Sequence, residues 1–150
     1  MKRMIPLVLL FAILACESPA GPPPGPPLER EPTLLRISVL EEVAEAGGTV
    51  TVRLENLSDL VIGYNLCLDR HVERWVGEWV DRRLPQDGFC PGIMITLAPG
   101  SEVTHEHQVP SALQPGIYRF DFGDGIDFEL PVNRLPDEDR KTNSFRVGSS

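Results

Sequence analysis

Apolar and polar residues alternate along most of the chain that follows residue 33. In residues 49–55, Val50, Val52 and Leu54 alternate with polar side chains, which predicts a strand with one buried face. The same pattern and short apolar runs predict further strands over residues 34–40, 60–68, 72–76, 79–83, 93–97, 102–109, 117–122, 126–130 and 144–147. No segment has the sustained period of about 3.6 residues that marks an amphipathic helix. Such short strands predict an all-β, antiparallel sandwich or barrel, and we favour the sandwich.

Glycine and proline mark the turns between these strands. Pro99-Gly100 and Pro115-Gly116 suit type II turns, with proline and glycine as the two central residues. Gly77-Glu78 predicts a two-residue hairpin loop between the strands that flank it. Gly123-Asp124-Gly125 predicts a second hairpin between its own flanking strands.

Residues 113–118, Leu-Gln-Pro-Gly-Ile-Tyr, resemble the turn and tyrosine that enter a late strand of immunoglobulin-like domains. In those domains the tyrosine hydroxyl bonds back to nearby backbone, so the resemblance implies this role for Tyr118. With residues 52–58 and 97–100, the stretch looks like bacterial immunoglobulin-like lipoprotein domains. It is also similar, to a lesser degree, to the β-sandwich family that includes a bacterial intracellular proteinase inhibitor. The resemblance implies an immunoglobulin-like β-sandwich over residues 33–148.

The N-terminus has the organisation of an export signal. Lys2 and Arg3 precede an apolar run that ends at Ala15, which is shorter than the roughly 20 residues needed to span a bilayer. Ile13-Leu14-Ala15-Cys16 resembles the lipobox of bacterial lipoproteins. That resemblance implies that residues 1–15 are removed and that Cys16 carries the lipid anchor. The alternative is ordinary secretion with Cys16 as an incidental residue.

Residues 16–32 are rich in proline and glycine and predict an extended polyproline II linker between the lipidated cysteine and the domain. A ligand for a groove-type adaptor is the alternative interpretation. Glu17 stands where, in the lipoprotein resemblance, an Asp would indicate retention at the inner membrane. We therefore expect a protein of the bacterial cell envelope that faces the periplasm or the exterior, at the outer membrane if the host has two membranes.

The chain of 150 residues carries a formal net charge of −8, which becomes −10 once Lys2 and Arg3 leave with the signal peptide. We expect no nucleic acid partner, because affinity for phosphate backbones comes mainly from lysine and arginine. The net charge otherwise indicates only solubility.

Two cysteines remain in the domain, Cys67 and Cys90. A pair of cysteines in an exported domain predicts a disulfide, which would stabilise the fold by roughly 3 kcal/mol in the chain-entropy model. A metal or redox pair is the alternative, although a redox site more often has the Cys-x-x-Cys spacing that is absent here.

Alternation places His105 and His107 on one face of a strand, with His71 or an acid as a possible third metal ligand. The alternative is a solvated strand face. Residues 121–127 have acids at intervals that suggest a calcium loop, but they do not match the EF-hand pattern. Residues 137–141 are predicted to form a solvated loop before the last strand.

Trp75 and Trp79 are candidates for a carbohydrate-stacking or protein-binding surface. A two-residue hairpin loop would pair Trp75 with Val80 and Val76 with Trp79, which predicts that the two indoles lie on different faces. One would then be packed and the other available for binding.

The sequence contains no nucleophile, zinc-protease or phosphate-loop motif, so we expect neither an enzyme nor a cofactor. The predicted function is a binding or structural role at the cell envelope, with the lipid as the membrane contact. One alternative is a protease inhibitor that acts through an exposed loop between Arg83 and Phe89, as the family resemblance suggests. Another is a metal-binding envelope protein that uses His105 and His107.

Overall fold

The computed structural model describes residues 25–27, 31–67, 70–82, 90–128 and 135–148. Within these ranges the fold is all-β, as predicted, with two short 3-10 turns, η1 (Gly123–Gly125) and η2 (Asp137–Arg140). The strands are β1 (Leu35–Val39), β2 (Val43–Ala44), β3 (Thr49–Asn56), β4 (Ile62–Tyr64), β5 (His71–Trp75), β6 (Trp79–Asp81), β7 (Ile95–Leu97), β8 (Glu102–Gln108), β9 (Gly116–Asp121), β10 (Ile126–Phe128) and β11 (Phe145–Val147). No helix in the described ranges is long and apolar enough to cross a membrane.

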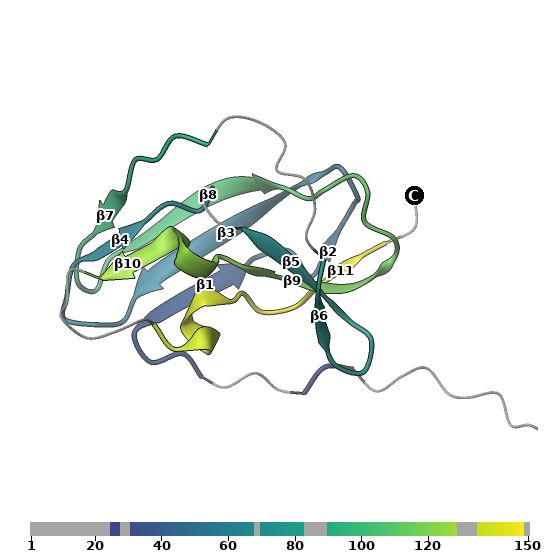
Figure 1. The fold of residues 1–150 in the computed structure, drawn as a ribbon, viewed down its shortest axis with the longest axis horizontal. Coiled ribbons are helices and arrows are strands. Elements are labelled where there is room, and N and C mark those ends of the chain that lie inside the picture. The colour runs from purple at the N-terminus through teal and green to yellow at the C-terminus, as the bar shows by residue number, and fades with distance from the viewer. Residues whose placement is uncertain (1–24, 28–30, 68–69, 83–89, 129–134, 149–150) are drawn as a thin grey trace, which may run out of the picture.

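The described strands form a β-sandwich (Figure 1). One layer is the three-stranded sheet β1-β3-β8, and the other is the five-stranded sheet β2-β11-β9-β5-β6. The small sheet β10-β4-β7 lies at one end of the molecule (Figure 1). Pairing is antiparallel except between β2 and β11, which run parallel. The predicted antiparallel β-sandwich is therefore confirmed.

The core lies between the two layers, where the alternating apolar residues meet. In β3, Val50, Val52 and Leu54 are each at most 1% exposed, as the sequence pattern predicted. Tyr118 and Phe120 of β9 fill the core from the opposite layer. Full burial of one large apolar side chain stabilises a fold by about 1.5–3 kcal/mol, so this shared core accounts for the pairing of the layers.

The predicted tyrosine bond is present at the start of β9. The Tyr118 hydroxyl donates a hydrogen bond to the carbonyl oxygen of Gln114 at 2.6 Å. The Arg74 guanidinium covers the same ring at 5.8 Å from its centroid and also donates to the Pro115 carbonyl at 3.0 Å. These contacts fix the start of β9 against β5. The type II turn predicted at Pro115-Gly116 is wrong, because Gly116 belongs to β9 and does not have the positive φ that the second central residue of such a turn needs.

The hairpin predicted around Gly123-Asp124-Gly125 is wrong. β9 pairs with β5 and β11, whereas β10 pairs with β4 in the small sheet. The chain instead passes from one sheet to another through η1, where Gly125 N–H donates to the Phe122 carbonyl at 2.7 Å. Phe122 and Ile126 are both buried. Because the chain crosses between two sheets here, both Phe122 and Ile126 can be buried.

Several strand bounds also differ from the prediction. The strand expected at residues 60–68 shortens to β4, and β2 was not predicted. Two residues are too few to show an alternation, and β2 exists through its parallel pairing with Arg146 and Val147 of β11.

The charged segment at residues 137–141, expected to be a solvated loop, contains η2 and a buried acid. Asp139 is 1% exposed. Its Oδ2 accepts hydrogen bonds from the backbone N–H groups of Leu34 at 2.7 Å and of Thr33 and Leu35 at 3.3 Å. The side chain of Asn143 similarly satisfies both backbone groups of Val39, at 2.7 and 3.1 Å. The C-terminal segment thus closes the free edge of β1.

Candidate binding face

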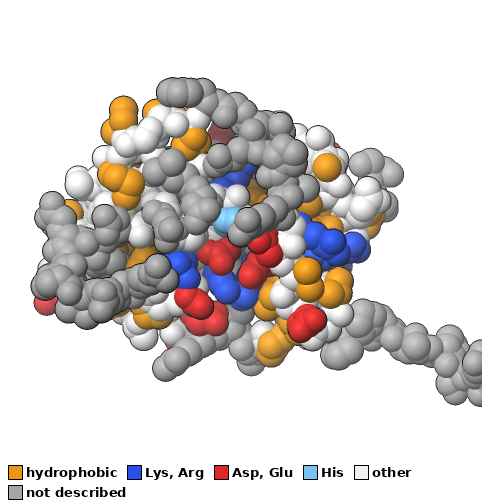
Figure 2. Space-filling model, in the orientation of Figure 1, with side chains coloured by type: hydrophobic (Ala, Val, Ile, Leu, Met, Phe, Trp, Pro, Cys, Tyr) orange, Lys and Arg blue, Asp and Glu red, His pale blue; other side chains and the backbone are white. Residues whose placement is uncertain are grey.

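The side of the five-stranded sheet that faces away from the core is the candidate functional site, and we call it the outer face. Val72, Tyr118 and Phe120 point into the core, so strand alternation turns their neighbours outward. The outer face comprises His71, Glu73 and Trp75 of β5, Trp79 and Asp81 of β6, and Ile117, Arg119 and Asp121 of β9. Figure 2 shows acidic and basic side chains interleaved at the middle of this view, with a histidine at their edge and hydrophobic side chains beside them.

Trp75 and Trp79 lie on the same face, so the prediction that they lie on different faces is wrong. They are directly paired across β5 and β6, and their ring centroids are 5.4 Å apart in an edge-to-face arrangement. This pairing leaves a loop of three residues, Val76 to Glu78, rather than two, and within it Val76 N–H donates to the Glu78 carbonyl at 3.0 Å. Gly77 has a φ of 100°, a left-handed conformation that favours glycine. The third loop residue shifts the register and brings the indoles together.

Arg119 supports the indole of Trp79 from β9. Its guanidinium carbon lies 4.3 Å from the Trp79 ring centroid, a cation–π contact worth about 0.5–2 kcal/mol depending on desolvation. The same guanidinium bonds the Glu73 carboxylate at 2.5 Å, and Arg119 is only 5% exposed. Since this charge-assisted pair fixes the guanidinium, the ring above it is held in one position.

A wider ion-pair network continues from this pair across the face. Lys141 Nζ lies 3.6 Å from the second oxygen of Glu73 and 3.8 Å from Asp121. Arg119 also lies 3.9 Å from Glu138 of η2. The network joins β5, β9, η2 and the segment after η2, and it places largely buried charges beside the tryptophan pair.

Sequence reasoning missed this network, although it singled out the tryptophans. Arg119 stands between Tyr118 and Phe120, and its partner Glu73 is far away in the sequence. The available signal was that Arg119 occupies an outward-facing position of a predicted strand, between two apolar residues that face the core. Its pairing with Glu73 depends on the register of β5 with β9, which turn residues do not reveal.

His71 does not join the other two histidines. It belongs to β5, where its Nδ1 lies 3.4 Å from an Asp81 oxygen. His105 and His107 belong to β8 in the opposite layer. His71 therefore does not supply the third metal ligand that the sequence suggested for His105 and His107.

His105 and His107 each have a partner within the domain. Tyr64 Oη lies 3.0 Å from His105 Nε2, and Arg70 Nη1 lies 3.3 Å from His107 Nδ1. Burial, followed by the charges of Arg70 and His105, lowers the pKa of His107 to about 4. At neutral pH the His107 imidazole is therefore uncharged and accepts a hydrogen bond from Arg70.

The described residues contain no group of three or more His, Cys, Asp or Glu side chains placed to hold a metal ion. In the suggested calcium loop, Asp121 Oδ1 accepts the N–H of Gly123 at 2.9 Å and faces Lys141. Asp121 thus has structural partners, as His105 and His107 do.

Cys67 and Cys90 form the predicted disulfide, with an S–S distance of 2.07 Å. Asn65 reinforces the same junction, since its side-chain amide donates to the carbonyl oxygens of Pro91 at 2.7 Å and Ile93 at 3.0 Å. Asn65 Oδ1 accepts the N–H of Cys67 at 3.1 Å. The bond therefore fastens the segment that carries β5 and β6 to the small sheet.

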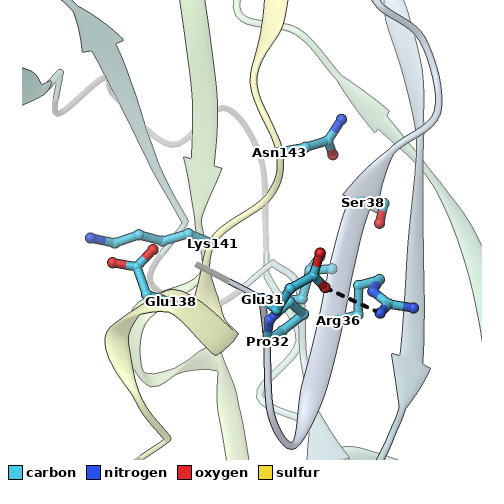
Figure 3. A pocket seen from close by; sticks show the side chains of 8 residues that line it. Glu31, Pro32, Arg36, Ser38, Glu138, Lys141 and Asn143 are labelled. Atoms are coloured by element: carbon cyan, nitrogen blue, oxygen red, sulfur yellow. Dashed lines mark ion pairs between the residues drawn. The ribbon is translucent and has the colours of Figure 1, made fainter. Parts of the chain in front are cut away.

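A cleft of about 190 Å³ lies between β1 and η2 (Figure 3). Glu31 and Arg36 form an ion pair on one side at 3.6 Å, and Glu138 and Lys141 lie on the other. Its mixed charges favour no particular ligand, and it contains no nucleophile paired with a base.

Two predicted features lie outside the described residues. These are Cys16, with the rest of the export signal, and the loop at residues 83–89 that was the candidate for protease inhibition. Both stay predictions.

No protein-family model and no curated protein matches the chain. Among solved structures, a β-glucosidase from Listeria innocua with gluconolactone is similar over 77% of this chain and 16% of that chain, with 17% identity and a TM-score of 0.36. Spo0M, a sporulation control protein from Bacillus subtilis, is 11% identical over 79% of this chain and 49% of that chain, with a TM-score of 0.40. The Pseudomonas fluorescens alkylpurine DNA glycosylase AlkC is 11% identical over 78% and 31%, with a TM-score of 0.34. The chain spans less than half the length of each protein, and similarity this low carries no argument about function.

Proposed function

We propose that the protein is a lipid-anchored, non-enzymatic binding domain of the bacterial cell envelope, which binds a protein partner through its outer face. The export signal and the lipobox-like Ile13–Cys16 stretch support the location. The proline-rich linker supports a domain held away from the membrane.

The strand arrangement supports an immunoglobulin-like version of the sandwich. One layer combines β1, β3 and β8, while the other combines β11, β9 and β5 with the additional edge strand β6. Immunoglobulin-like domains divide their strands between two sheets in a similar way, with a tyrosine bonded to upstream backbone at a corner. Tyr118 makes such a bond to Gln114.

The observation that carries the binding role is the pairing of Trp75 and Trp79 on the outer face, above the Arg119–Glu73 pair. Tryptophan and arginine are enriched among the residues that dominate protein–protein binding energy. Val76, at the tip of the same hairpin, is 52% exposed. An apolar, aromatic tip resembles the centre of an interface, and the charged pair beneath it holds the Trp79 ring in place.

The anchor is tested by the intact mass of protein from native membranes. A mature N-terminus at Cys16 with acyl mass is expected, and Cys16→Ser should abolish both the acyl mass and the membrane association. An unmodified mass that starts elsewhere would reject the anchor.

The binding role is tested by a photo-crosslinking residue placed at Val76 in the cell envelope. A matched residue at Thr104, exposed on β8 of the opposite layer, is the control. We expect a discrete crosslinked product from position 76 and none from 104. Arg119→Met combined with Glu73→Leu, which removes the support of the Trp79 ring, should weaken the product. No product at 76, or the same product at both positions, would reject the outer face as the binding site.

A further inference from the structure

A groove lies on the outer side of the five-stranded sheet, at its β2 end. Val43 of β2 and Ile117 of β9 supply its aliphatic side chains, and Gly25 and Pro26 of the proline-rich linker line it as well. The groove measures about 340 Å³, and its remaining lining residues are Glu42, Ser144, Phe145 and Arg146. Pro26 is half-buried, whereas its neighbours Gly25 and Pro27 are exposed. One proline of the linker therefore lies against the sheet.

The width of the three strands beside the linker suits a short polyproline II segment. Arg146 of β11 pairs with Val43 on one side and with Ile117 on the other, so the groove extends across three neighbouring strands. Strands lie about 4.8 Å apart, which makes this span about 10 Å. Three residues of polyproline II rise about 9 Å, so a segment of this length can cross the three strands, and Gly25 and Pro26 already form part of the groove wall.

The chemistry of the two surfaces also matches. A proline ring is apolar and has almost no side-chain entropy to lose on docking, and a polyproline II segment is already extended before it binds. Val43 and Ile117 offer aliphatic contacts to such a ring. Docking within one chain benefits further from a high effective concentration, because Pro26 lies close in sequence to Leu35, where β1 begins.

We propose that this groove is the docking site of the chain's own proline-rich linker, bound in cis, with Pro26 as its anchor. The linker is then a latch on the sheet as well as a spacer. Arg74 of β5 pairs with Tyr118 of β9. The next position along this antiparallel register brings Ile117 beside Trp75 on the outer face. If the outer face has the proposed binding role, the docked linker covers one end of it, and a partner that reaches Ile117 must displace the linker.

Site-specific thiol labelling tests the docking itself. Ser144 lines the groove, so Ser144→Cys introduces a nearly isosteric reporter there. Ser101→Cys, at a half-buried site before β8, is the matched control. Each reporter is placed in the full chain, once with the natural linker and once with Pro26→Ser and Pro27→Ser, which keep the linker length. Maleimide labelling rates are followed for the single peptide that carries each reporter, so the state of Cys16 does not affect the readout.

We expect the proline substitutions to accelerate labelling of Cys at position 144 and to leave position 101 unchanged. If the groove is covered three-quarters of the time, the acceleration is about fourfold, because reactivity follows the open fraction. Equal rates at position 144 with both linkers would overturn the proposal. Protection that disappears on dilution would also overturn it, because the occupant would then be the linker of a second copy. Since partner binding is not measured, the docking can succeed or fail independently of the proposed function.

Discussion

Acid should destabilise this domain through one buried histidine. His107 is 9% exposed, its ring packs edge-to-face on Phe122 at 5.5 Å, and its Nδ1 faces Arg70 at 3.3 Å. Protonation would place a second positive charge beside Arg70 and near His105. Burial and these two charges are the reasons that the pKa of His107 is lowered to about 4.

The sign and size of the effect follow from linkage. In the unfolded chain the His107 pKa returns to about 6.5, so the unfolded state takes up the proton first as the pH falls. The stabilisation that comes from keeping His107 neutral is therefore fully present above pH 6.5. It decreases as the pH falls towards 4 and is lost below that pH. The full effect is about 3 kcal/mol, of which about 2 kcal/mol falls between pH 7 and pH 5.

The measurement is the urea-derived free energy of unfolding at pH 7 and pH 5, for the natural chain and for His107→Gln. Glutamine keeps an acceptor for Arg70 and does not titrate, while the carboxylates and the other histidines are common to both proteins. We expect the natural chain to lose about 2 kcal/mol more than the variant over this interval. Equal losses in the two proteins would refute the assignment of His107 as a buried, neutral group.

Three further predictions concern the free energy of unfolding. Reduction of the Cys67–Cys90 bond, whose sequence separation is 23, should lower it by about 3 kcal/mol, and an unchanged denaturation midpoint in reductant would contradict this. Asp139→Asn should lower it by about 2 kcal/mol, because the carboxylate accepts several backbone N–H groups at the start of β1. Asp137→Asn, at an exposed site on the same turn, is the control and should change the free energy of unfolding by less than about 1 kcal/mol. Equal losses in the two variants would mean that the change in net charge, and not the lost hydrogen bonds, causes the effect. Tyr118→Phe, which removes the bond to Gln114, should lower it by about 1 kcal/mol in thermal or urea unfolding, and a neutral result would show that the turn is held by other contacts.

The predictable part of this fold was set by local pattern. Val50, Val52 and Leu54 occupy the buried face because a strand turns every second side chain the same way. The Tyr118 bond spans only four residues, so the motif that specifies it is complete within one stretch of sequence. The disulfide was predictable because only two of the three cysteines, Cys67 and Cys90, lie in the predicted domain, and two cysteines allow one pairing.

The remaining features depend on register and on contacts between distant segments. One additional loop residue at Val76–Glu78 changes the partner of Trp75 from Val80 to Trp79 and brings both indoles to one face. Asp139 looked solvated because its sequence neighbours are charged, yet its partners lie more than 100 positions earlier in the chain. Neither the loop length nor such a distant partner can be read from composition.

The Arg119–Glu73 pair links this fold to the proposed binding role. Burial of an ion pair is a poor way to stabilise a protein, because desolvation of both charges offsets most of their attraction, and apolar replacements are often as stable or more so. Stability alone therefore does not account for a 5% exposed arginine on the outer face of the sheet. Its position beneath Trp79, at 4.3 Å from the ring centroid, does account for it, because the pair holds a large aromatic surface in one orientation. A ring that is already held in place loses little conformational entropy when a partner covers it, and that property benefits an interface more than it benefits the isolated domain.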